Sequence, residues 1–342
     1  MGRLSHSQAG VTVVTAMTTY LSGIQPSGLQ HLGNYFGAIR QHIELQAEAG
    51  EHFYFIADYH ALTTNRDPAA LRECVRETAI TYLALGLDPE RATLFRQSDV
   101  PEVTELTWLL ASVTGMGLLE RAHSYKDKLA HGVKPNVGLF TYPILMAADI
   151  LAYDSDVVPV GKDQVQHVEM AQDMAGYFNG AYGEVFTRPE YRLAGEAFTK
   201  VPGLDGQKMS KTYGNDLWIF ESGKRLKKRV GKLVTDSRPP EEAKDPDEIL
   251  PMDFLALFLD PGELEEWRGR VREGGAEAPG YGHMKMRVVE AMEEQFAPAR
   301  TRREELLADP GRVDEILEQG GQVAGNRARE VRERALAACG LR

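Results

Sequence analysis

Residues 20–43 read YLSGIQPSGLQHLGNYFGAIRQHI. An apolar run at 20–24 leads into a turn at 25–28, and apolar side chains at helical spacing follow. This order of strand, turn and helix is typical of an α/β domain with a parallel sheet. Backbone N–H groups and the helix dipole favour an anionic phosphate at such a helix start, and Gly28 and Gly33 let a ligand approach the backbone.

Short apolar runs recur further along the chain, separated by helical stretches. They lie at residues 53–57, 93–95 and 157–160. Polar segments follow three of the predicted strands, at residues 25–28, 58–60 and 161–164. Because the carboxyl ends of parallel strands lie at one edge of the sheet, we expect these segments to converge on one pocket. The chain has neither a G-x-G-x-x-G fingerprint nor a P-loop motif, so the usual dinucleotide and P-loop sites lose their support.

The composition changes past Asp216, where strand-like runs stop and helix-forming residues dominate. Helical stretches are predicted at residues 253–259, 284–296, 302–307, 313–317 and 324–338. We therefore expect an α/β domain with a helical insertion at 17–215 and a helical domain at 216–342. Residues 1–16 lack the pattern of an export or organelle signal, and we expect them to form a flexible extension.

The overall composition is that of an ordinary globular protein, with 43% hydrophobic and 26% charged residues among 342. No apolar run is long enough to span a bilayer, so we expect no membrane partner. The only cysteines, Cys74 and Cys339, are too isolated for a disulfide framework or a thiolate metal site, which indicates a reducing cytoplasm. A formal net charge of −11 argues against indiscriminate binding of nucleic acid but leaves room for local basic patches.

Two groups of basic residues are candidates for such patches. The first comprises Lys224, Arg225, Lys227, Lys228, Arg229 and Lys232. The second comprises Arg327, Arg329, Arg332 and Arg334. For the second group, a helix face whose charges pair with neighbouring glutamates explains the pattern at least as well as a nucleic-acid surface.

A second motif, Lys208-Met209-Ser210-Lys211-Thr212, lies far from the first. Two lysines three residues apart around a small hydroxyl suit a mobile clamp on a polyphosphate. Taken alone, the first motif is also compatible with an ordinary loop turn, and the second with a solvated surface loop. Their occurrence together and in this order favours a two-sided ATP site.

The pair resembles the HIGH-like and KMSKS motifs of class I aminoacyl-tRNA synthetases, with residues 31–34 and 208–212 in the two positions. Between them, residues 142–151 read YPILMAADIL and resemble the amino-acid-binding helix of bacterial tryptophanyl-tRNA synthetases. Other segments agree with this family, namely residues 22–28, 33–38, 158–164 and 280–282. The resemblance extends from about residue 20 to the C-terminus.

The resemblance implies a Rossmann-like catalytic domain and a helical anticodon-binding domain. The implied enzyme activates L-tryptophan with ATP to tryptophanyl-adenylate, releases pyrophosphate, and transfers tryptophan to tRNA(Trp). The implied protein is a cytoplasmic homodimer that uses ATP with Mg²⁺. Some family members carry an iron–sulfur cluster on clustered cysteines; two isolated cysteines predict neither such a cluster nor zinc here.

The resemblance also implies roles for individual residues around ATP, and no protein metal ligands. The implied catalytic residues are Lys208, Lys211, Lys128, His31 and Asn34. The implied ATP-binding residues are Gln25, Pro26, Ser27, Gly33, Asn34, Gly161, Lys162, Asp163, Val201, Lys208, Met209, Ser210, Lys211 and Thr212. Three positions depart from the pattern of many relatives, namely Lys162, Thr212 and Leu21. These departures concern details of specificity and leave the reaction class unchanged.

The implied tryptophan-binding residues are Asp149, Met146, Tyr142, Gln164, His60 and Gln25. Asp149 lies in an otherwise apolar helical stretch, and a buried carboxylate needs a partner. The indole N–H is a donor only, so an acceptor carboxylate suits it. A neighbouring lysine or a helix terminus would satisfy Asp149 equally well, and tyrosine could also donate to it.

Two alternatives remain open from the sequence. The first is a tyrosyl-tRNA synthetase or another class I nucleotidyl transferase that activates a small carboxylate, although the long helical tail argues against relatives without one. The second is a synthetase-like protein that binds tryptophan or a partner as a regulator and charges tRNA poorly. Intact lysine and glycine-asparagine motifs disfavour an inactive enzyme.

Overall fold

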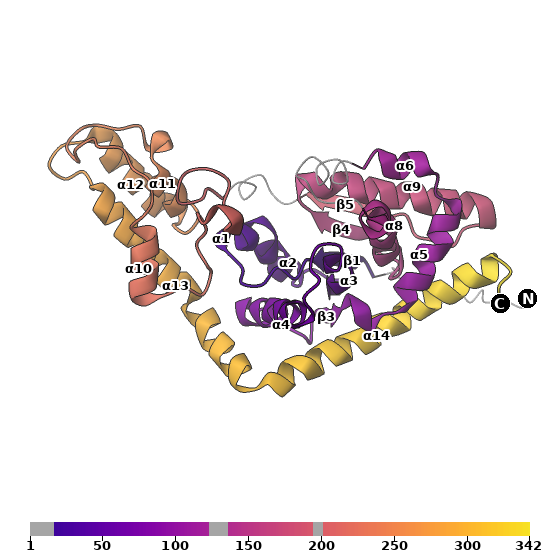
Figure 1. The fold of residues 1–342 in the computed structure, drawn as a ribbon. Coiled ribbons are helices and arrows are strands. Elements are labelled where there is room, and N and C mark those ends of the chain that lie inside the picture. Colours follow the sequence, from indigo (N-terminus) through magenta and orange to yellow (C-terminus); the bar gives the residue numbers. More distant parts are fainter. Residues whose placement is uncertain (1–16, 123–135, 194–200) are drawn as a thin grey trace, which may run out of the picture.

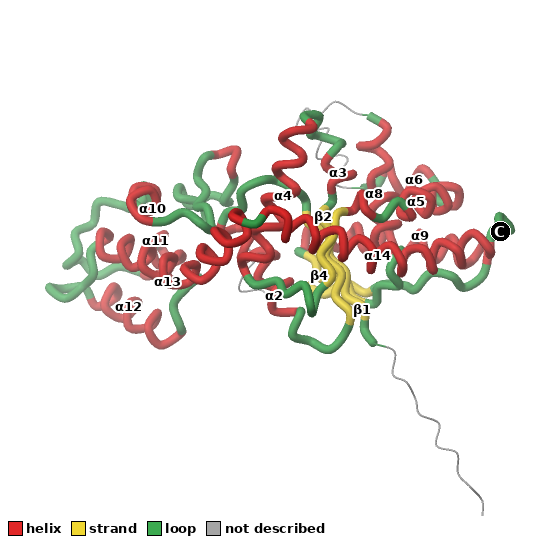
Figure 2. Tube along the Cα trace, turned by 90° about the horizontal axis from the view of Figure 1, so that it is seen from below, coloured by secondary structure: helices red, strands yellow, loops and turns green. Residues whose placement is uncertain are grey.

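A five-stranded parallel sheet lies at the centre of the protein (Figure 2). The structure, a computed structural model, describes residues 17–122, 136–193 and 201–342, so the predicted extension at 1–16 lies outside it. The strands follow the order β3-β2-β1-β4-β5. Their bounds are Thr19–Ile24 (β1), Glu51–Ile56 (β2), Thr93–Arg96 (β3), Val157–Val160 (β4) and Glu190–Leu193 (β5). The predicted α/β fold is confirmed.

Strand β5 is an element that the hydrophobic pattern did not predict. The strands β1 to β4 coincide with the four predicted apolar runs, whereas all residues of β5 are exposed. β5 pairs with β4 alone at the edge of the sheet. Its backbone pairing rather than burial defines it as a strand, and hydropathy carries no signal for that.

Helices cover both faces of the sheet (Figure 1). The helices of the α/β part are α1 (Leu32–Asn34), the π-helix η1 (Tyr35–Ile39), α2 (Arg40–Leu45), α3 (Asp58–Ala61), α4 (Pro68–Leu85), η2 (Gln97–Asp99), α5 (Glu102–Val113), α6 (Met116–Glu120), α8 (Val137–Leu151), η3 (Lys162–Gln164) and α9 (Val165–Tyr182). Short 3-10 turns such as η2 and η3 follow the strand ends and carry polar side chains toward the edge of the sheet.

Successive side chains of β2 enter two different apolar cores. Phe53 and Phe55 pack in the cluster that contains residues of α5, α8 and α9. Tyr54 and Ile56 pack in the cluster that contains residues of α4 and of the C-terminal helices. Because side chains alternate along a strand, a continuous apolar run supplies both faces of a sheet that is covered on both sides.

Past Asp216 the described chain forms helices and loops with no further strand of the sheet. The short helix η5 (Lys211–Tyr213) lies just before Asp216. The helices after Asp216 are α10 (Gly223–Val230), η6 (Pro246–Glu248), α11 (Leu250–Leu255), α12 (Pro261–Glu273), α13 (Tyr281–Ala308) and α14 (Pro310–Ala338). Four of the predicted helical stretches merge in pairs into the two long helices α13 and α14, whereas α10 and α12 were not predicted. None of the helices in the described ranges is long and apolar enough to cross a membrane.

The last helix, α14, returns to the α/β part and lies along β3 and α5 (Figure 1). Its approach to the sheet is very close at Gly320, where a Cβ atom would lie 2.0 Å from the Leu94 carbonyl oxygen. At Gly321 a Cβ would lie 2.7 Å from the Cβ of Asp99. Glycine is therefore required at both positions for the helix to reach β3 and η2.

The second group of basic residues lies on α14 and pairs with acids of the α/β part. Its ion pairs are Arg327 with Glu51, Arg329 with Glu102, Arg332 with Glu105 and Arg334 with Asp154. Of the two interpretations of this group, the structure favours charge pairing. Most of the acids come from other elements, and Glu333, which pairs with Arg332, lies on α14 itself. The domain boundary at 215 and 216 stays a prediction.

Candidate active site

The turn after β1 places His31 at the start of α1. His31 Nδ1 accepts a hydrogen bond from the Asn34 backbone N–H at 3.3 Å, and Asn34 Oδ1 accepts one from the His31 backbone N–H at 3.1 Å. This reciprocal capping box fixes the helix start. Burial, and next the nearby Lys211, lower the pKa of His31, so the ring is neutral and its proton lies on Nε2 as a donor.

The lysine loop is held by a short pairing with the segment before it. Pro202 and Lys208 form an isolated antiparallel bridge, and the Met209 N–H donates to the Val201 carbonyl at 3.4 Å. Met209 and Val201 are both buried. The loop therefore rests on an apolar base, while Lys208 and Lys211 are exposed.

Asn215 is a residue of this loop that the sequence analysis did not single out. Its Oδ1 accepts from the Ser210 N–H at 2.8 Å, and its Nδ2 donates to the Lys208 carbonyl at 3.2 Å. Nδ2 also donates to Asp205 Oδ1 at 2.7 Å. A Cβ at Gly203 would lie 2.2 Å from this nitrogen, so only glycine leaves room for it. Asn215 thus fixes the backbone on both sides of Met209.

The two predicted ATP motifs lie against each other. Lys211 Nζ donates to the Ser27 carbonyl at 2.6 Å, which joins the lysine loop directly to the turn after β1. The segment that follows the loop also pairs with the first motif, through Leu32 N–H to the Leu217 carbonyl at 2.9 Å and Ile219 N–H to the Gln30 carbonyl at 3.1 Å. Residues almost two hundred positions apart therefore form one structural unit.

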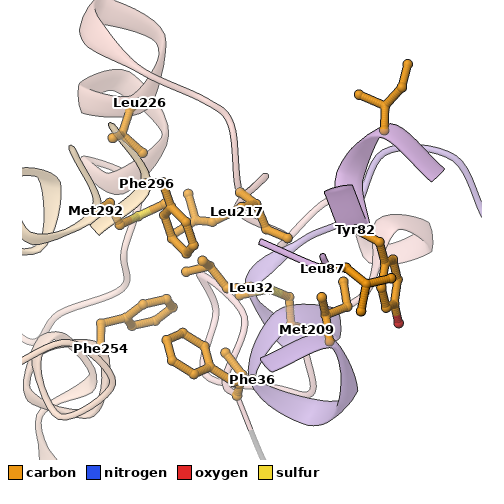
Figure 3. Packing of buried hydrophobic residues seen from close by; sticks show 14 of the residues in the cluster. Leu32, Phe36, Tyr82, Leu87, Met209, Leu217, Leu226, Phe254, Met292 and Phe296 are labelled. Atoms are coloured by element: carbon orange, nitrogen blue, oxygen red, sulfur yellow. The ribbon is translucent and has the colours of Figure 1, made fainter. Parts of the chain in front are cut away.

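An apolar cluster supports this contact from the side of the C-terminal helices (Figure 3). Leu32 and Met209, one from each motif, belong to the same cluster as Leu217, Phe254 and Phe296. Their burial links both ATP motifs to α11 and α13. A shift of those helices would therefore be transmitted to the two motifs.

The other predicted ATP residues lie at the carboxyl ends of β1 and β4 or in the lysine loop. Gln25 and Ser27 are exposed, Pro26 is buried, and Gly33 is half-buried on α1. Gly161 and Lys162 lie at the start of η3, directly after β4. Thr212 is an exposed residue of η5. Lys128 and the side chain of Asp163 lie outside the described residues.

Asp149 is a buried residue of α8 with a side chain 1% exposed. His60 Nε2 lies 2.9 Å from Asp149 Oδ2, and Gln97 Nε2 lies 2.8 Å from both carboxylate oxygens. Burial raises the pKa of Asp149, and the hydrogen bond from His60 opposes that rise. The partners are a histidine and an amide rather than the lysine or helix terminus that the sequence left open.

Tyr142 and Gln164 are joined by a histidine that the sequence analysis missed. The Tyr142 hydroxyl lies 3.0 Å from His167 Nε2, and His167 Nδ1 lies 2.9 Å from Gln164 Oε1. Because Gln164 Oε1 can only accept, Nδ1 carries the proton and Nε2 accepts from the tyrosine hydroxyl. Burial raises the pKa of Tyr142 to about 12, so its hydroxyl stays protonated and its oxygen can still accept.

Tyr142, Met146 and Asp149 share one face of α8, since they are spaced four and three residues apart. The ring of His60, from α3, meets Tyr142 edge-on with ring centroids 6.3 Å apart. The structure thus brings together Tyr142, His60 and Asp149 and links Gln164 to them through His167. Only the spacing of Gln164 and His167, three residues apart at the start of α9, could have indicated His167 from sequence.

Comparisons with known proteins agree with this geometry. Residues 15–257 match the family described as tRNA synthetases class I (W and Y). A tryptophan–tRNA ligase from Rhodopirellula baltica is 55% identical over 322 residues, which cover 94% of this chain and 99% of the relative. The chain belongs to the bacterial tryptophanyl-tRNA synthetase family. The resemblance inferred from the sequence is therefore confirmed.

Other members of this family are similar over the same extent. A tryptophan–tRNA ligase from Fusobacterium nucleatum is 49% identical over 326 residues, covering 95% of this chain and 98% of the relative. A crystal structure of tryptophanyl-tRNA synthetase from Campylobacter jejuni, complexed with ADP and tryptophan, superimposes with a TM-score of 0.88 at 46% identity. It covers 95% of this chain and 100% of that one. The similarity includes the C-terminal helices as well as the sheet.

Proposed function

We infer that this protein is a tryptophan–tRNA ligase, which activates L-tryptophan with ATP and transfers it to tRNA(Trp). The observation that carries this function is similarity along almost the whole chain to tryptophan–tRNA ligases, at 55% identity in one case. The contact between Lys211 and the turn after β1 supports it independently, because it joins the two ATP motifs into one site.

In the first step, the carboxylate of tryptophan attacks the α-phosphorus of ATP and pyrophosphate leaves. This displacement needs no covalent nucleophile from the protein, because positioning and charge stabilisation suffice. We assign the stabilisation of pyrophosphate to Lys208 and Lys211, with Lys128 as a third lysine. The neutral His31 donates from Nε2, and Asn34, from Nδ2, toward the phosphates and ribose, with the backbone at 25–27 beside them.

The remaining nucleotide contacts come from the end of β4 and the segment before the lysine loop. Gly161, Lys162 and Asp163 are assigned to the ribose side, and the buried Val201 to the adenine. Mg²⁺, when bound with ATP, would neutralise part of the charge on the phosphates. The resemblance implies no protein ligands for this ion, and we keep that assignment in the proposal.

Tryptophan is bound along the face of α8 that carries Tyr142, Met146 and Asp149. The Tyr142 oxygen, whose proton is directed to His167, accepts from the substrate ammonium together with Gln164. Asp149 accepts from the indole N–H. A phenylalanine ring would leave that buried carboxylate without its substrate donor, and sites of this kind reject such analogues by about four to five orders of magnitude.

In the second step, a terminal ribose hydroxyl of tRNA attacks the acyl group of the adenylate. We assign tRNA binding to the helical region at 216–342, where the basic residues Lys224, Lys227 and Lys228 of α10 are exposed. Such a surface binds phosphate without requiring an overall positive charge. We place the enzyme in the cytoplasm, where tRNA charging takes place.

The enzyme acts as a homodimer in this proposal. Among the described residues, Trp108 of α5 and Val137 of α8 are 75% and 79% exposed. Exposed apolar groups of this size favour a protein partner, and Trp108→Glu is expected to shift the enzyme to monomers in analytical ultracentrifugation.

The test of the function is amino-acid-dependent exchange of pyrophosphate into ATP, followed by charging of tRNA(Trp). Exchange is expected with tryptophan and not with tyrosine or phenylalanine. Exchange with tyrosine alone would overturn the substrate assignment. Binding of tryptophan without exchange would identify a regulatory binding protein instead of an enzyme.

A further inference from the structure

The side chain of Gln97 is buried between two strand ends and has a defined orientation. Gln97 follows β3, is 1% exposed, and its Oε1 accepts from the Tyr59 backbone N–H at 3.1 Å. Since an amide oxygen is the only acceptor in this side chain, the hydrogen bond identifies which end is the oxygen. The NH₂ group is therefore the end that faces Asp149, 2.8 Å from Oδ1 and from Oδ2.

The two oxygens of Asp149 are not equivalent. Oδ2 accepts from both Gln97 and His60, whereas among the described residues Oδ1 accepts from Gln97 alone. Each carboxylate oxygen has about two acceptor positions. Oδ1 is thus the oxygen with capacity for a further donor, and the donors on the other side of the carboxylate hold it in place.

The surroundings of Asp149 require donors of this kind. Burial raises the pKa of Asp149 and the nearby Asp58 raises it further, whereas the bonds from His60 and Gln97 lower it. Asp58 is itself held by Ser98, the residue after Gln97, through Oγ at 2.5 Å and the backbone N–H at 3.0 Å. The end of β3 therefore positions both carboxyl groups, because consecutive residues contact Asp149 and Asp58.

We propose that Gln97 is a positioning residue for substrate selection, which orients the Asp149 carboxylate so that Oδ1 receives the indole N–H. Gln97 thereby allows the site to discriminate tryptophan from amino acids of similar shape whose ring carries no hydrogen-bond donor. This inference rests on the proposed assignment of Asp149 to the indole. It adds to the residues of α8 a further residue, Gln97, which follows strand β3.

The test compares tryptophan with β-(benzothien-3-yl)alanine, in which sulfur replaces the ring N–H at nearly the same shape. The measured quantity is the kcat/KM for tryptophan divided by the kcat/KM for the analogue, both in ATP–pyrophosphate exchange. Gln97→Met removes the amide and keeps the length of the side chain. It is expected to lower the ratio about tenfold or more, mostly through a higher KM for tryptophan, because a hydrogen bond to a charged group is lost.

Asp149→Ala separates this inference from the assignment on which it rests. If Asp149→Ala leaves the ratio unchanged, Asp149 does not bind the indole and the assignment itself is wrong. If Asp149→Ala lowers the ratio and Gln97→Met lowers kcat/KM equally for both amino acids, the role of Gln97 is structural and the inference is wrong. In the Asp149→Ala background, Gln97→Met is expected to change the ratio little further.

Gln46→Met is the matched control. The Gln46 amide also makes two hydrogen bonds, to the Gly86 carbonyl and from the Asp88 N–H, but lies away from Asp149. It is expected to lower the melting temperature without changing the ratio. If Gln97→Met does not fold, Gln97→Asn withdraws the amide by one carbon and should lower the ratio in the same direction; an unchanged ratio in this variant contradicts the inference.

Discussion

Lys211 is the residue through which the two ATP motifs meet. Its ammonium group donates to the Ser27 carbonyl. Desolvation of that group, opposed by nearby Cys74 and Asp216, lowers the pKa of Lys211, although the residue as a whole is exposed. In the substrate complex the same ammonium group can give up its hydrogen bond to the neutral Ser27 carbonyl and donate to a phosphate oxygen instead. The gain in interaction is greatest when negative charge develops on the leaving pyrophosphate, so its effect belongs mainly to the transition state.

Replacement of this lysine should therefore affect catalysis more than amino-acid binding. Lys211→Ala is expected to lower the exchange rate about a hundredfold or more, while tryptophan affinity changes little. Exchange kinetics and equilibrium binding of tryptophan measure the two quantities. Lys228→Ala, an exposed lysine of α10, serves as the control and should leave both unchanged. Equal losses of rate and affinity in Lys211→Ala would refute the assigned role.

The residues of the candidate site differ in how readily the sequence points to them. The lysines and His31 belong to contiguous motifs, which local sequence reveals. Gln97, His167 and Asn215 were missed, because each acts through partners from other elements or through loop backbone atoms. A glutamine after a strand or a histidine in a helix has no pattern that distinguishes it from an ordinary polar residue.

At the scale of elements, a buried polar group ties β1, α2 and α4 together. His42 Nε2 lies 2.9 Å from Ser22 Oγ, and its Nδ1 lies 3.1 Å from the Tyr82 hydroxyl. The Tyr54 hydroxyl donates to the His42 carbonyl at 2.9 Å. Complete burial lowers the pKa of His42 to about 4 from 6.5, so the ring is neutral in the folded protein at neutral pH.

This depressed pKa makes stability depend on pH. Below pH 6.5 the unfolded chain takes up a proton at His42, whereas the folded protein does so only near pH 4. The contribution of His42 to the free energy of unfolding is therefore fully present above pH 6.5. It is lost as the pH falls toward 4, and the loss is at most roughly 3 kcal/mol. Urea unfolding between these pH values measures the loss.

A variant can show that His42 is the source of this dependence. His42→Gln is expected to be less stable at neutral pH but to lose less stability on acidification than the parent. His283→Gln, at an exposed position, should retain the parent's pH dependence. If the His42 variant loses as much stability on acidification as the parent protein, other groups cause the pH dependence.

The contact of α14 with the sheet depends on the absence of a side chain at Gly320. A methyl group there would meet the Leu94 backbone, which cannot move without disturbing β3. Gly320→Ala is expected to lower the free energy of unfolding by about 1–3 kcal/mol, as overpacking does. Gly325→Ala, on the same helix with nothing within 4 Å of the added Cβ, should raise it by up to about 1 kcal/mol. Thermal and urea unfolding measure both, and a stabilised Gly320→Ala would disprove the close approach.

At the scale of the whole molecule, the long helices α13 and α14 run from the helical region that we propose binds tRNA to the α/β part that carries the candidate site. α13 leaves the helical group of α10 to α12, and α14 continues along β3 to the far side of the α/β part (Figure 1). The arginines of the second basic group form ion pairs with the acidic residues opposite α14. The first group, on and just after α10, is mostly exposed and is therefore the better surface for tRNA.

Reversal of charge on α10 should weaken tRNA binding selectively. Lys227→Glu with Lys228→Glu is expected to raise the Kd for tRNA(Trp), and to reduce the dependence of log K on log salt by about 2. Pyrophosphate exchange should be unchanged. Arg312→Glu, an exposed position on α14, is the charge-matched control. Binding that is insensitive to salt, or unaffected by the double variant, would refute this placement of tRNA.

The sequence by itself determined the α/β class, four strands of the sheet and the family, and it predicted the two ATP motifs, because all of these are carried by short contiguous patterns. Only the tertiary structure decided that Lys211 reaches Ser27, that Gln97 and His60 hold Asp149, and that α14 packs on β3. The physical reason is that each of these contacts joins residues from separate elements. Their geometry depends on how the sheet and helices pack, which local propensity does not specify.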